Sequence, residues 1–337
     1  MEFYKELRKY PWDEIEKRIE SSTASDVERA LSVQSIKLED FVSLLSPAAG
    51  PFLEAMAQRA HGLTEQRFGR VISLFAPLYL SNVCSNSCVY CGFNSKNRVA
   101  RRTLSIEEAA VEAGQIHDMG FRHILLVSGD SPHIITNDYL RAVTEVLRPL
   151  FASISIEIFP LGTDAYRELI GYGIDGLTVF QETYNEARYK DFHPTGKKRD
   201  FSWRLGTPDQ GGEAGFRRIG LGALLGLCNW RTEGFFLGLH TRHLQRSFWK
   251  SHISISFPRL CPAAGAYQPS HPVSDRNFVQ LLTALRLFLP DAGMVLSTRE
   301  SPFFRDHLIP IGVTSMSAGS RTEPGGYTQR NEDRKST

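Results

Sequence analysis

The sequence predicts an α/β protein built on a TIM-type (β/α)8 barrel. From residue 71 onward, short apolar runs alternate with segments of helical period. Strands that alternate with helices are typical of parallel βαβ units, and eight of them favour a closed barrel over the alternative, an open doubly wound sheet. The eight runs that we interpret as strands are 71–80, 123–127, 153–159, 176–180, 234–239, 253–257, 294–297 and 313–317.

Helices are expected between these runs and before them. Residues 1–67 predict an N-terminal helical extension, with one helix beginning at Thr23 and others at 37–45 and 51–67. Residues 68–327 then form the barrel, and the polar residues 328–337 are expected to be a disordered tail. The barrel helices are expected at 106–119, 137–151, 164–172, 212–228, 242–251, 275–289 and 302–309.

The composition narrows the function classes. A chain of 337 residues with a net charge of +2 gives no reason to expect a nucleic acid or an anionic membrane as partner. No apolar stretch is long enough to span a bilayer, and the charged N-terminus has no signal-peptide core. Three of the five cysteines are clustered, which favours a metal site in a reducing compartment, and we expect the cytoplasm.

The cluster is formed by Cys84, Cys88 and Cys91, at C-x3-C-x2-C spacing. Soft thiolate ligands select iron–sulfur clusters, zinc or Cu(I). A closed structural site normally takes four protein ligands, so three leave one position open for something that binds and reacts. A zinc knuckle and a redox dithiol are the alternatives.

This loop, with Tyr90 just before the last cysteine, resembles the cluster loop of the radical S-adenosylmethionine (SAM) enzymes. The resemblance implies that Cys84, Cys88 and Cys91 hold a 4Fe–4S cluster and that SAM occupies its fourth iron. Reductive cleavage of SAM would then give a 5′-deoxyadenosyl radical, which abstracts a hydrogen atom from the substrate.

Two acidic residues lie at the second and third strand candidates, Asp130 just after the second and Glu157 inside the third. Gly129 and Asp130 end the second run, where a glycine lets a ligand approach and a carboxylate can bind an ammonium. The resemblance implies that this pair receives the amino group of SAM, with Asp130 in place of the usual Glu. Glu157 lies between isoleucines, where burial is costly without a partner. By position it resembles the residue that meets the ribose or methionine part of SAM, with a salt-bridged structural role as the alternative.

Later strand ends offer further candidates. Gln181, Glu182, Thr183 and Tyr184 form either a pocket wall or a turn. Arg259 follows the run 253–257, and its bidentate fork suits a carboxylate. His252 and Arg299 also lie near later strand ends and are further candidates for the site. The basic connection 185–212 is either a lid or a solvated loop. His240 and His243 could bind a metal, but a core or surface role is favoured for both.

Four stretches together resemble the tyrosine lyase (2-iminoacetate synthase, ThiH) family: 181–227, SISFPRL, LSTRESPFFRDHLIP and SAGSRTEPGGY. The resemblance covers nearly the whole chain. It implies cleavage of the Cα–Cβ bond of L-tyrosine to 2-iminoacetate and p-cresol for thiamine thiazole synthesis. Arg259 and Glu182 are the catalytic candidates. The implied partners are thiazole synthase and an electron donor such as flavodoxin or ferredoxin.

The chain departs from that family pattern in two places. Cys261 stands where the family usually has a second Arg, and the last barrel helix is expected to be missing, which predicts lower stability than in longer relatives. The rival interpretations are the tyrosine lyase of hydrogenase maturation, a radical SAM enzyme acting on another aromatic amino acid or a biotin-like precursor, and a non-catalytic iron–sulfur partner of thiazole synthase. No cysteine follows Cys261, which disfavours the first, because that enzyme has a second, C-terminal cluster.

Overall fold

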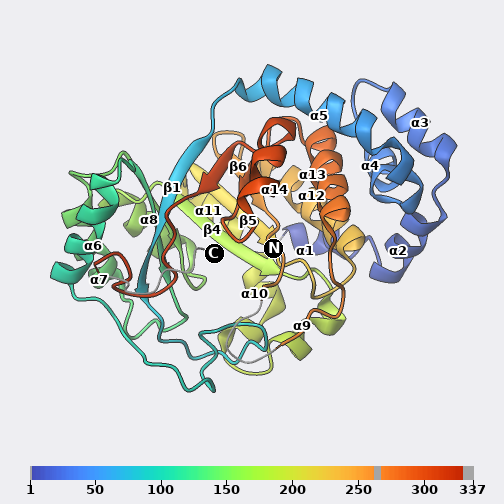
Figure 1. The fold of residues 1–337 in the computed structure, drawn as a ribbon. Coiled ribbons are helices and arrows are strands. Elements are labelled where there is room, and N and C mark those ends of the chain that lie inside the picture. Colours follow the sequence, from blue (N-terminus) through green and yellow to red (C-terminus); the bar gives the residue numbers. More distant parts are fainter. Residues whose placement is uncertain (1, 262–266, 329–337) are drawn as a thin grey trace.

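The computed structural model describes residues 2–261 and 267–328 (Figure 1). Within them, eight parallel strands close into a barrel in chain order, so the predicted (β/α)8 class is confirmed. The strands are β1 (Ser73–Ser81), β2 (His123–Ser128), β3 (Ser153–Glu157), β4 (Gly176–Glu182), β5 (Arg218–Ala223), β6 (His252–Ser256), β7 (Gly293–Leu296) and β8 (Ser315–Ser317).

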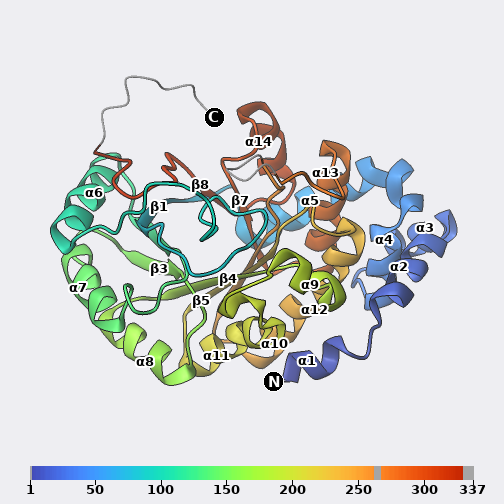
Figure 2. The ribbon, with the colours of Figure 1, turned by 90° about the horizontal axis from the view of Figure 1, so that it is seen from below.

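Helices surround the barrel (Figure 2). Their apolar faces cover the outward-pointing residues of the strands, which makes one continuous core. None of the helices in the described part of the chain is both long and apolar enough to span a membrane. The barrel helices are α6 (Ile106–Asp118), α7 (Asn137–Leu147), α8 (Thr163–Tyr172), α9 (Glu186–Phe192), α10 (Phe201–Leu205), α11 (Thr207–Ala214), α12 (Trp230–Ser247), α13 (Asp275–Phe288) and α14 (Pro302–Leu308).

The N-terminal residues fold into a helical layer outside the barrel. In Figure 1 this layer lies beside α12 and α13. Polar contacts fix it there: Arg231 of α12 donates to the Leu45 carbonyl at 2.5 Å, and Gln280 of α13 donates to the Leu44 carbonyl at 2.9 Å. The layer consists of α1 (Glu2–Leu7), α2 (Trp12–Ser21), α3 (Ala24–Ser32), α4 (Leu38–Leu45), the 3-10 helix Pro47–Phe52 and α5 (Leu53–Phe68).

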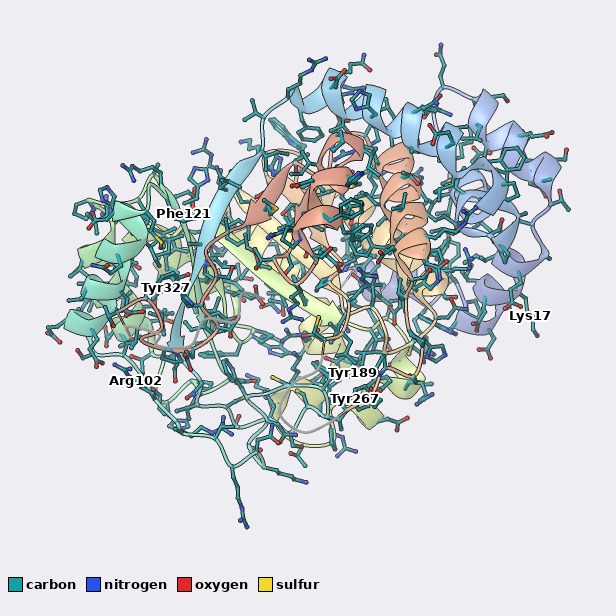
Figure 3. All side chains as sticks on the ribbon, viewed as in Figure 1. Lys17, Arg102, Phe121, Tyr189, Tyr267 and Tyr327 are labelled. Atoms are coloured by element: carbon teal, nitrogen blue, oxygen red, sulfur yellow. The ribbon has the colours of Figure 1, made fainter. Side chains whose placement is uncertain are left out.

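No helix follows β8 among the residues described up to Thr328. Turns close that side of the barrel instead. The Tyr327 hydroxyl donates to the Pro77 carbonyl of β1 at 2.8 Å, and its amide donates to Glu112 of α6 at 2.8 Å. Figure 3 shows Tyr327 and Arg102 on this side of the molecule. The predicted disordered tail beyond Thr328 lies outside the described residues.

The fifth strand was predicted in the wrong place. The apolar run 234–239 lies inside α12, and β5 lies within the segment 212–228 that we expected to be helical. The run 234–239 is apolar because α12 is buried between the barrel and the N-terminal layer. In β5 the glycines are there for packing: a Cβ at Gly222 would lie 2.5 Å from the Ser256 carbonyl oxygen of β6.

Candidate functional site

The barrel encloses a cavity of about 420 Å³, lined by inward-pointing residues of its strands. The carboxyl ends of the strands face the viewer in Figure 2, where the segment between β1 and α6 crosses the mouth of the barrel. Tyr79, Glu157, Phe180, Pro258 and Arg299 line the cavity at this end. In barrels of this type the active site lies at the carboxyl ends of the strands, so this end is the candidate site.

The three predicted metal ligands lie in the loop that follows β1. Cys88 is buried, and Cys84 and Cys91 are half-buried. The loop is shaped by side chains that bind its carbonyls: Asn94 donates to the Cys88 oxygen at 3.0 Å, and Arg101 donates to the Phe93 oxygen at 2.9 Å. The loop therefore has its own hydrogen-bonded frame.

The cysteine pKa values reflect a site that needs a cation. Burial raises the pKa of Cys88 to about 11, and it also raises the pKa of Cys91. Lys198 opposes both shifts, and the thiolates disfavour one another. A metal centre would replace the lost solvation of these thiolates.

The described residues contain no group of three or more His, Cys, Asp or Glu side chains arranged around a single metal ion. A cubane cluster makes a different demand, because each thiolate binds its own iron atom. Three cysteines on one partly buried loop therefore suit a 4Fe–4S cluster, and the residues described next suit SAM.

Gly129 and Asp130 at the end of β2 touch the cysteine loop. A Cβ at Gly129 would lie 2.2 Å from the Val83 oxygen and 3.0 Å from the Cβ of Cys84, so only glycine fits. The buried Asp130 carboxylate accepts a hydrogen bond from Asn86 at 2.7 Å. Its other oxygen has no partner among the described residues. An unsatisfied buried carboxylate oxygen beside the cysteines suits an ammonium group such as that of SAM.

Residues 192–198, part of the connection predicted as a lid or loop, run along the cysteine loop. The Val89 amide donates to the Phe192 oxygen at 3.1 Å, and the Ser87 and Thr195 hydroxyls lie 2.5 Å apart. A Cβ at Gly196 would clash with Asn86. This segment therefore forms a second wall of the cysteine loop rather than a solvated connection.

Tyr90 is fixed by the same segment. His193 Nδ1 lies 2.8 Å from the Tyr189 carbonyl, to which it can only donate. Burial lowers the pKa of His193 to about 3, so the ring is neutral and its Nε2 is an acceptor. The Tyr90 hydroxyl donates to that atom at 2.7 Å. Tyr90 thus anchors the cysteine loop through His193.

Glu182 lies at a bulge at the end of β4, with a positive φ of 71° that is costly for a residue other than glycine. Lys198 Nζ lies 2.6 Å from its carboxylate, and Arg204 lies 3.8 Å away. Burial alone would raise the pKa of Glu182, but these two cations more than offset it and lower the pKa. Glu182 therefore holds Lys198 beside the cysteine loop as a carboxylate.

Glu157 at the end of β3 lines the cavity. Burial, and then the charge of Glu182, raise its pKa to about 7, while Arg299 opposes the shift. Burial likewise raises the pKa of Tyr79 to about 12, with contributions from Glu157 and from Cys91. Because Glu157 and Cys91 both raise the pKa of Tyr79, the cysteine loop and Glu157 lie at the same end of the cavity.

Arg259 is not among the described residues that line the cavity. Its guanidinium forms ion pairs with Glu300 and, at 2.6 Å, with Asp275, and it donates to the Val273 carbonyl at 3.1 Å. Arg299 lines the cavity in its place. The role of Arg259 as a carboxylate clamp stays a prediction, and its guanidinium is already occupied by protein carboxylates.

Behind the site, the stretch after Glu182 turns away from the cavity into the core. The buried Glu233 accepts hydrogen bonds from the Thr183 hydroxyl and from the Tyr184 amide. The Tyr184 hydroxyl lies 3.0 Å from His240, whose ring stacks on Phe3 at 3.9 Å. Tyr184 and His240 therefore have packing roles.

The structure brings together the three cysteines, Tyr90, Gly129, Asp130, Glu157 and Glu182 at one end of the barrel. The sequence-based reasoning missed Lys198 and Arg204, which neutralise Glu182. The signal for Lys198 was the basic run 197–199, although it does not say which of its residues turns inward. The second histidine of the pair, His243, bonds to Asp209 at 2.6 Å.

Comparisons with known proteins agree with this geometry. The model of the radical SAM superfamily matches residues 78–230, and that of the biotin and thiamin synthesis associated domain matches residues 256–336. Among solved structures, the [FeFe]-hydrogenase maturase HydG is similar with a TM-score of 0.88 and 33% identity, covering 96% of this chain and 73% of HydG.

Curated relatives give a more specific match. The 2-iminoacetate synthase of Escherichia coli (strain K12) is 47% identical over 97% of this chain and 87% of its own length. That of Salmonella typhimurium is 47% identical over 95% of this chain and 85% of its own length. With this identity over nearly its whole length, the chain belongs to the 2-iminoacetate synthase family of radical SAM proteins.

Proposed function

We infer that this protein is a radical SAM tyrosine lyase, which cleaves the Cα–Cβ bond of L-tyrosine to give 2-iminoacetate and p-cresol for the thiazole of thiamine. The observation that carries this function is the 47% identity to two 2-iminoacetate synthases over nearly the whole chain. The site supports it: a three-cysteine loop and an unsatisfied carboxylate meet at the mouth of a cavity inside the barrel.

We propose that Cys84, Cys88 and Cys91 hold a 4Fe–4S cluster and that SAM binds at its open iron. Once bound, and with one electron from an external donor, the cluster and SAM would supply a 5′-deoxyadenosyl radical able to abstract a hydrogen atom from the amino group of tyrosine. The residues of this chain position SAM and shield the radical. Gly129 gives the ligand access to the backbone, and Asp130 offers its free oxygen to the ammonium.

Three further residues complete the proposed cofactor site. Glu157 is half-buried at the end of β3 and lines the cavity, and we propose that it accepts a hydrogen bond from a ribose hydroxyl of SAM. Tyr90 fixes the cysteine loop through its bond to His193. Glu182, predicted as catalytic, holds Lys198 at 2.6 Å, and we propose that this ion pair sets the charge around the cysteine loop.

Tyrosine needs a cation for its carboxylate. We propose Arg299, because it lines the cavity at the end where the cysteine loop lies. The rival is Arg259, which the sequence suggested, and which the ion pairs to Glu300 and Asp275 hold outside the cavity wall. The cavity walls exclude water from the bound substrate, which protects a radical from quenching.

The partners are also proposals. Thiazole synthase is the expected consumer of 2-iminoacetate, and flavodoxin or ferredoxin is the expected electron donor. The cytoplasm as location rests on the cysteine pattern of the sequence alone.

Anaerobic turnover tests the function. The reconstituted enzyme receives SAM, tyrosine and a reductant, and 5′-deoxyadenosine, p-cresol and glyoxylate (from hydrolysis of 2-iminoacetate) are measured together. The lyase predicts tyrosine-dependent formation of all three. Formation of 5′-deoxyadenosine without p-cresol would indicate another substrate, and an iron-loaded protein that forms neither would be the non-catalytic partner of thiazole synthase.

A further inference from the structure

The end of the barrel cavity opposite the cysteine loop is polar. TIM barrels normally fill their interior with layers of bulky branched side chains, and the N-terminal end serves stability. Here the cavity is lined at that end by residues at the starts of six strands. They are Ser73, His123, Ser153, Arg218, His252 and Ser315. Stability alone does not explain a polar layer at this position.

These residues lie around one end of the barrel. In the strand registers, His123 pairs with Ser153, Arg218 pairs with His252, and Ser73 pairs with Ser315. Side chains of residues that are paired in register point to the same face of the sheet, here into the cavity. Arg218 therefore shares one polar layer at this end of the cavity with two imidazoles and three hydroxyls.

Arg218 is the cation of this layer, and its guanidinium has no ion pair or side-chain hydrogen bond among the described residues. The neighbouring carboxylate, Asp175, accepts the Ser153 hydroxyl at 2.8 Å. A guanidinium that borders a cavity without a partner presents its donors to whatever occupies the cavity.

The two histidines favour an anion without adding charge of their own. Partial burial, and then the Arg218 charge, lower the pKa values of both His123 and His252, whereas the Asp175 carboxylate opposes the shift of His123. Both rings are therefore neutral at pH 7, and each has one N–H to donate. His123 Nδ1 lies 3.1 Å from the Ser73 hydroxyl, which orients its ring.

Small residues keep the cavity continuous between its two ends. A Cβ at Gly176 would lie 2.2 Å from the Ser155 hydroxyl, and one at Gly220 would lie 2.8 Å from the Thr178 hydroxyl. A small molecule released at the cysteine end therefore meets the polar layer inside the same cavity. Ser73 and His123 also border a separate surface hollow formed with Val71 and Leu74.

We propose that Arg218, with His252 and His123, forms a second binding subsite for a small carboxylate at the N-terminal end of the barrel. The guanidinium binds the carboxylate through its two-donor edge, and the neutral imidazoles donate to the same anion. Resting on the proposed function, the occupant is 2-iminoacetate, the carboxylate product, held after its formation and before its transfer to the next enzyme.

Binding of glyoxylate, the stable oxygen analogue of 2-iminoacetate, tests the subsite. Calorimetric titration of the anaerobic holoenzyme is compared for the wild type, Arg218→Gln, Arg218→Lys and the matched control Arg217→Gln, whose side chain is exposed and outside the cavity lining. We expect Arg218→Gln to weaken glyoxylate binding at least about 10-fold, Arg218→Lys to restore part of it, and Arg217→Gln to bind like the wild type.

Other outcomes would overturn the proposal. They are wild-type glyoxylate affinity in both Arg218 variants, no glyoxylate binding by the wild type, and an equal loss of affinity for tyrosine, which would assign Arg218 to the substrate site. Inorganic phosphate is titrated as a competitor. Displacement of glyoxylate by phosphate at equal concentration would indicate a general oxyanion site and would also contradict the proposal.

Should Arg218→Gln fail to fold, the glyoxylate affinity of Arg218→Lys decides. A wild type that binds glyoxylate through Arg218 but forms no p-cresol would refute the proposed function and leave the carboxylate subsite standing.

Discussion

The two ends of the barrel cavity are built in different ways. At the cysteine end, the polar groups come from loops far apart in the chain, such as Tyr90 and His193, and they are paired with one another. At the opposite end, Arg218 and His252 are the first residues of their strands, and the Arg218 guanidinium borders the cavity with no ion pair or side-chain hydrogen bond to any residue that the structure describes. The cysteine end is thus organised to hold a metal cluster and the ammonium of SAM, whereas the opposite end is a fixed cationic layer.

The largest expected effect separates the two ends. Cys88→Ala removes one of three iron ligands, so the cluster should be lost and 5′-deoxyadenosine formation should fall by on the order of 1000-fold. Glyoxylate binding at the Arg218 end should remain. Iron content and product analysis measure the loss. The matched control is Cys228→Ala, a buried free cysteine outside the loop, which should keep its iron. A Cys88→Ala protein with a full iron content would contradict the ligand assignment.

Gly129→Ala should have the next largest effect. The new Cβ would meet the Val83 oxygen at 2.2 Å, which forces the end of β2 away from the cysteine loop. We expect a loss of about 2–4 kcal/mol in stability and about 100-fold in SAM cleavage. Thermal unfolding and a 5′-deoxyadenosine assay measure both.

Its control is Gly114→Ala in α6, where a Cβ meets nothing within 4 Å. That variant should be neutral, or more stable by up to about 1 kcal/mol. Equal behaviour of the two alanine variants would show that β2 and the cysteine loop are not packed as described.

Arg299→Gln and Arg259→Gln should have different effects: the first on the KM for tyrosine, and the second on stability. Loss of a charge-assisted clamp costs about 1.5–3 kcal/mol, so Arg299→Gln should raise the tyrosine KM about 10- to 100-fold. Arg259→Gln breaks the ion pairs to Glu300 and Asp275 and should mainly lower the melting temperature. The reverse pattern would assign the clamp to Arg259.

The smallest expected effect is that of Glu157 on the pH dependence of stability. Its pKa is raised to about 7 in the folded protein, from an ordinary value of 4.5. The folded state therefore holds the extra proton, so its stabilisation is complete below pH 4.5 and is lost as the pH rises through about 7, by on the order of 3 kcal/mol.

Glu157→Gln stays neutral at all pH values and removes that slope. Melting curves of the holoenzyme without SAM, recorded from pH 5 to 8, should show the variant gaining on the wild type as the pH rises. Parallel curves would mean that Glu157 is ionised throughout, as an ion-paired structural carboxylate would be.

The barrel could be predicted from the sequence because apolar runs alternate with helical segments, and most of these runs are strands in the structure. It failed at β5 because Arg218–Ala223 was included in the helix expected at 212–228, and because burial on two sides made 234–239 in α12 look like a strand. Only tertiary packing distinguishes these cases, since both are short apolar runs with glycine.

Some residues of the candidate site could likewise be predicted from the sequence, and others could not. The spacing of Cys84, Cys88 and Cys91 was visible because one short loop supplies all three. Lys198 and Arg218 were not singled out, because their roles depend on which way a side chain points after the chain has travelled around the barrel. Arg259 was chosen over Arg299 for the same reason: both follow strands, and only the structure shows that Arg299 lines the cavity.

The most direct test of the central claim is hyperfine spectroscopy of the reduced enzyme with SAM labelled with ¹⁵N in its amino group and ¹⁷O in its carboxylate. We expect couplings from both labels to a three-cysteine 4Fe–4S cluster, and we expect Asp130→Ala to weaken SAM binding. A cluster with four protein ligands, or a spectrum that SAM leaves unchanged, would contradict that claim.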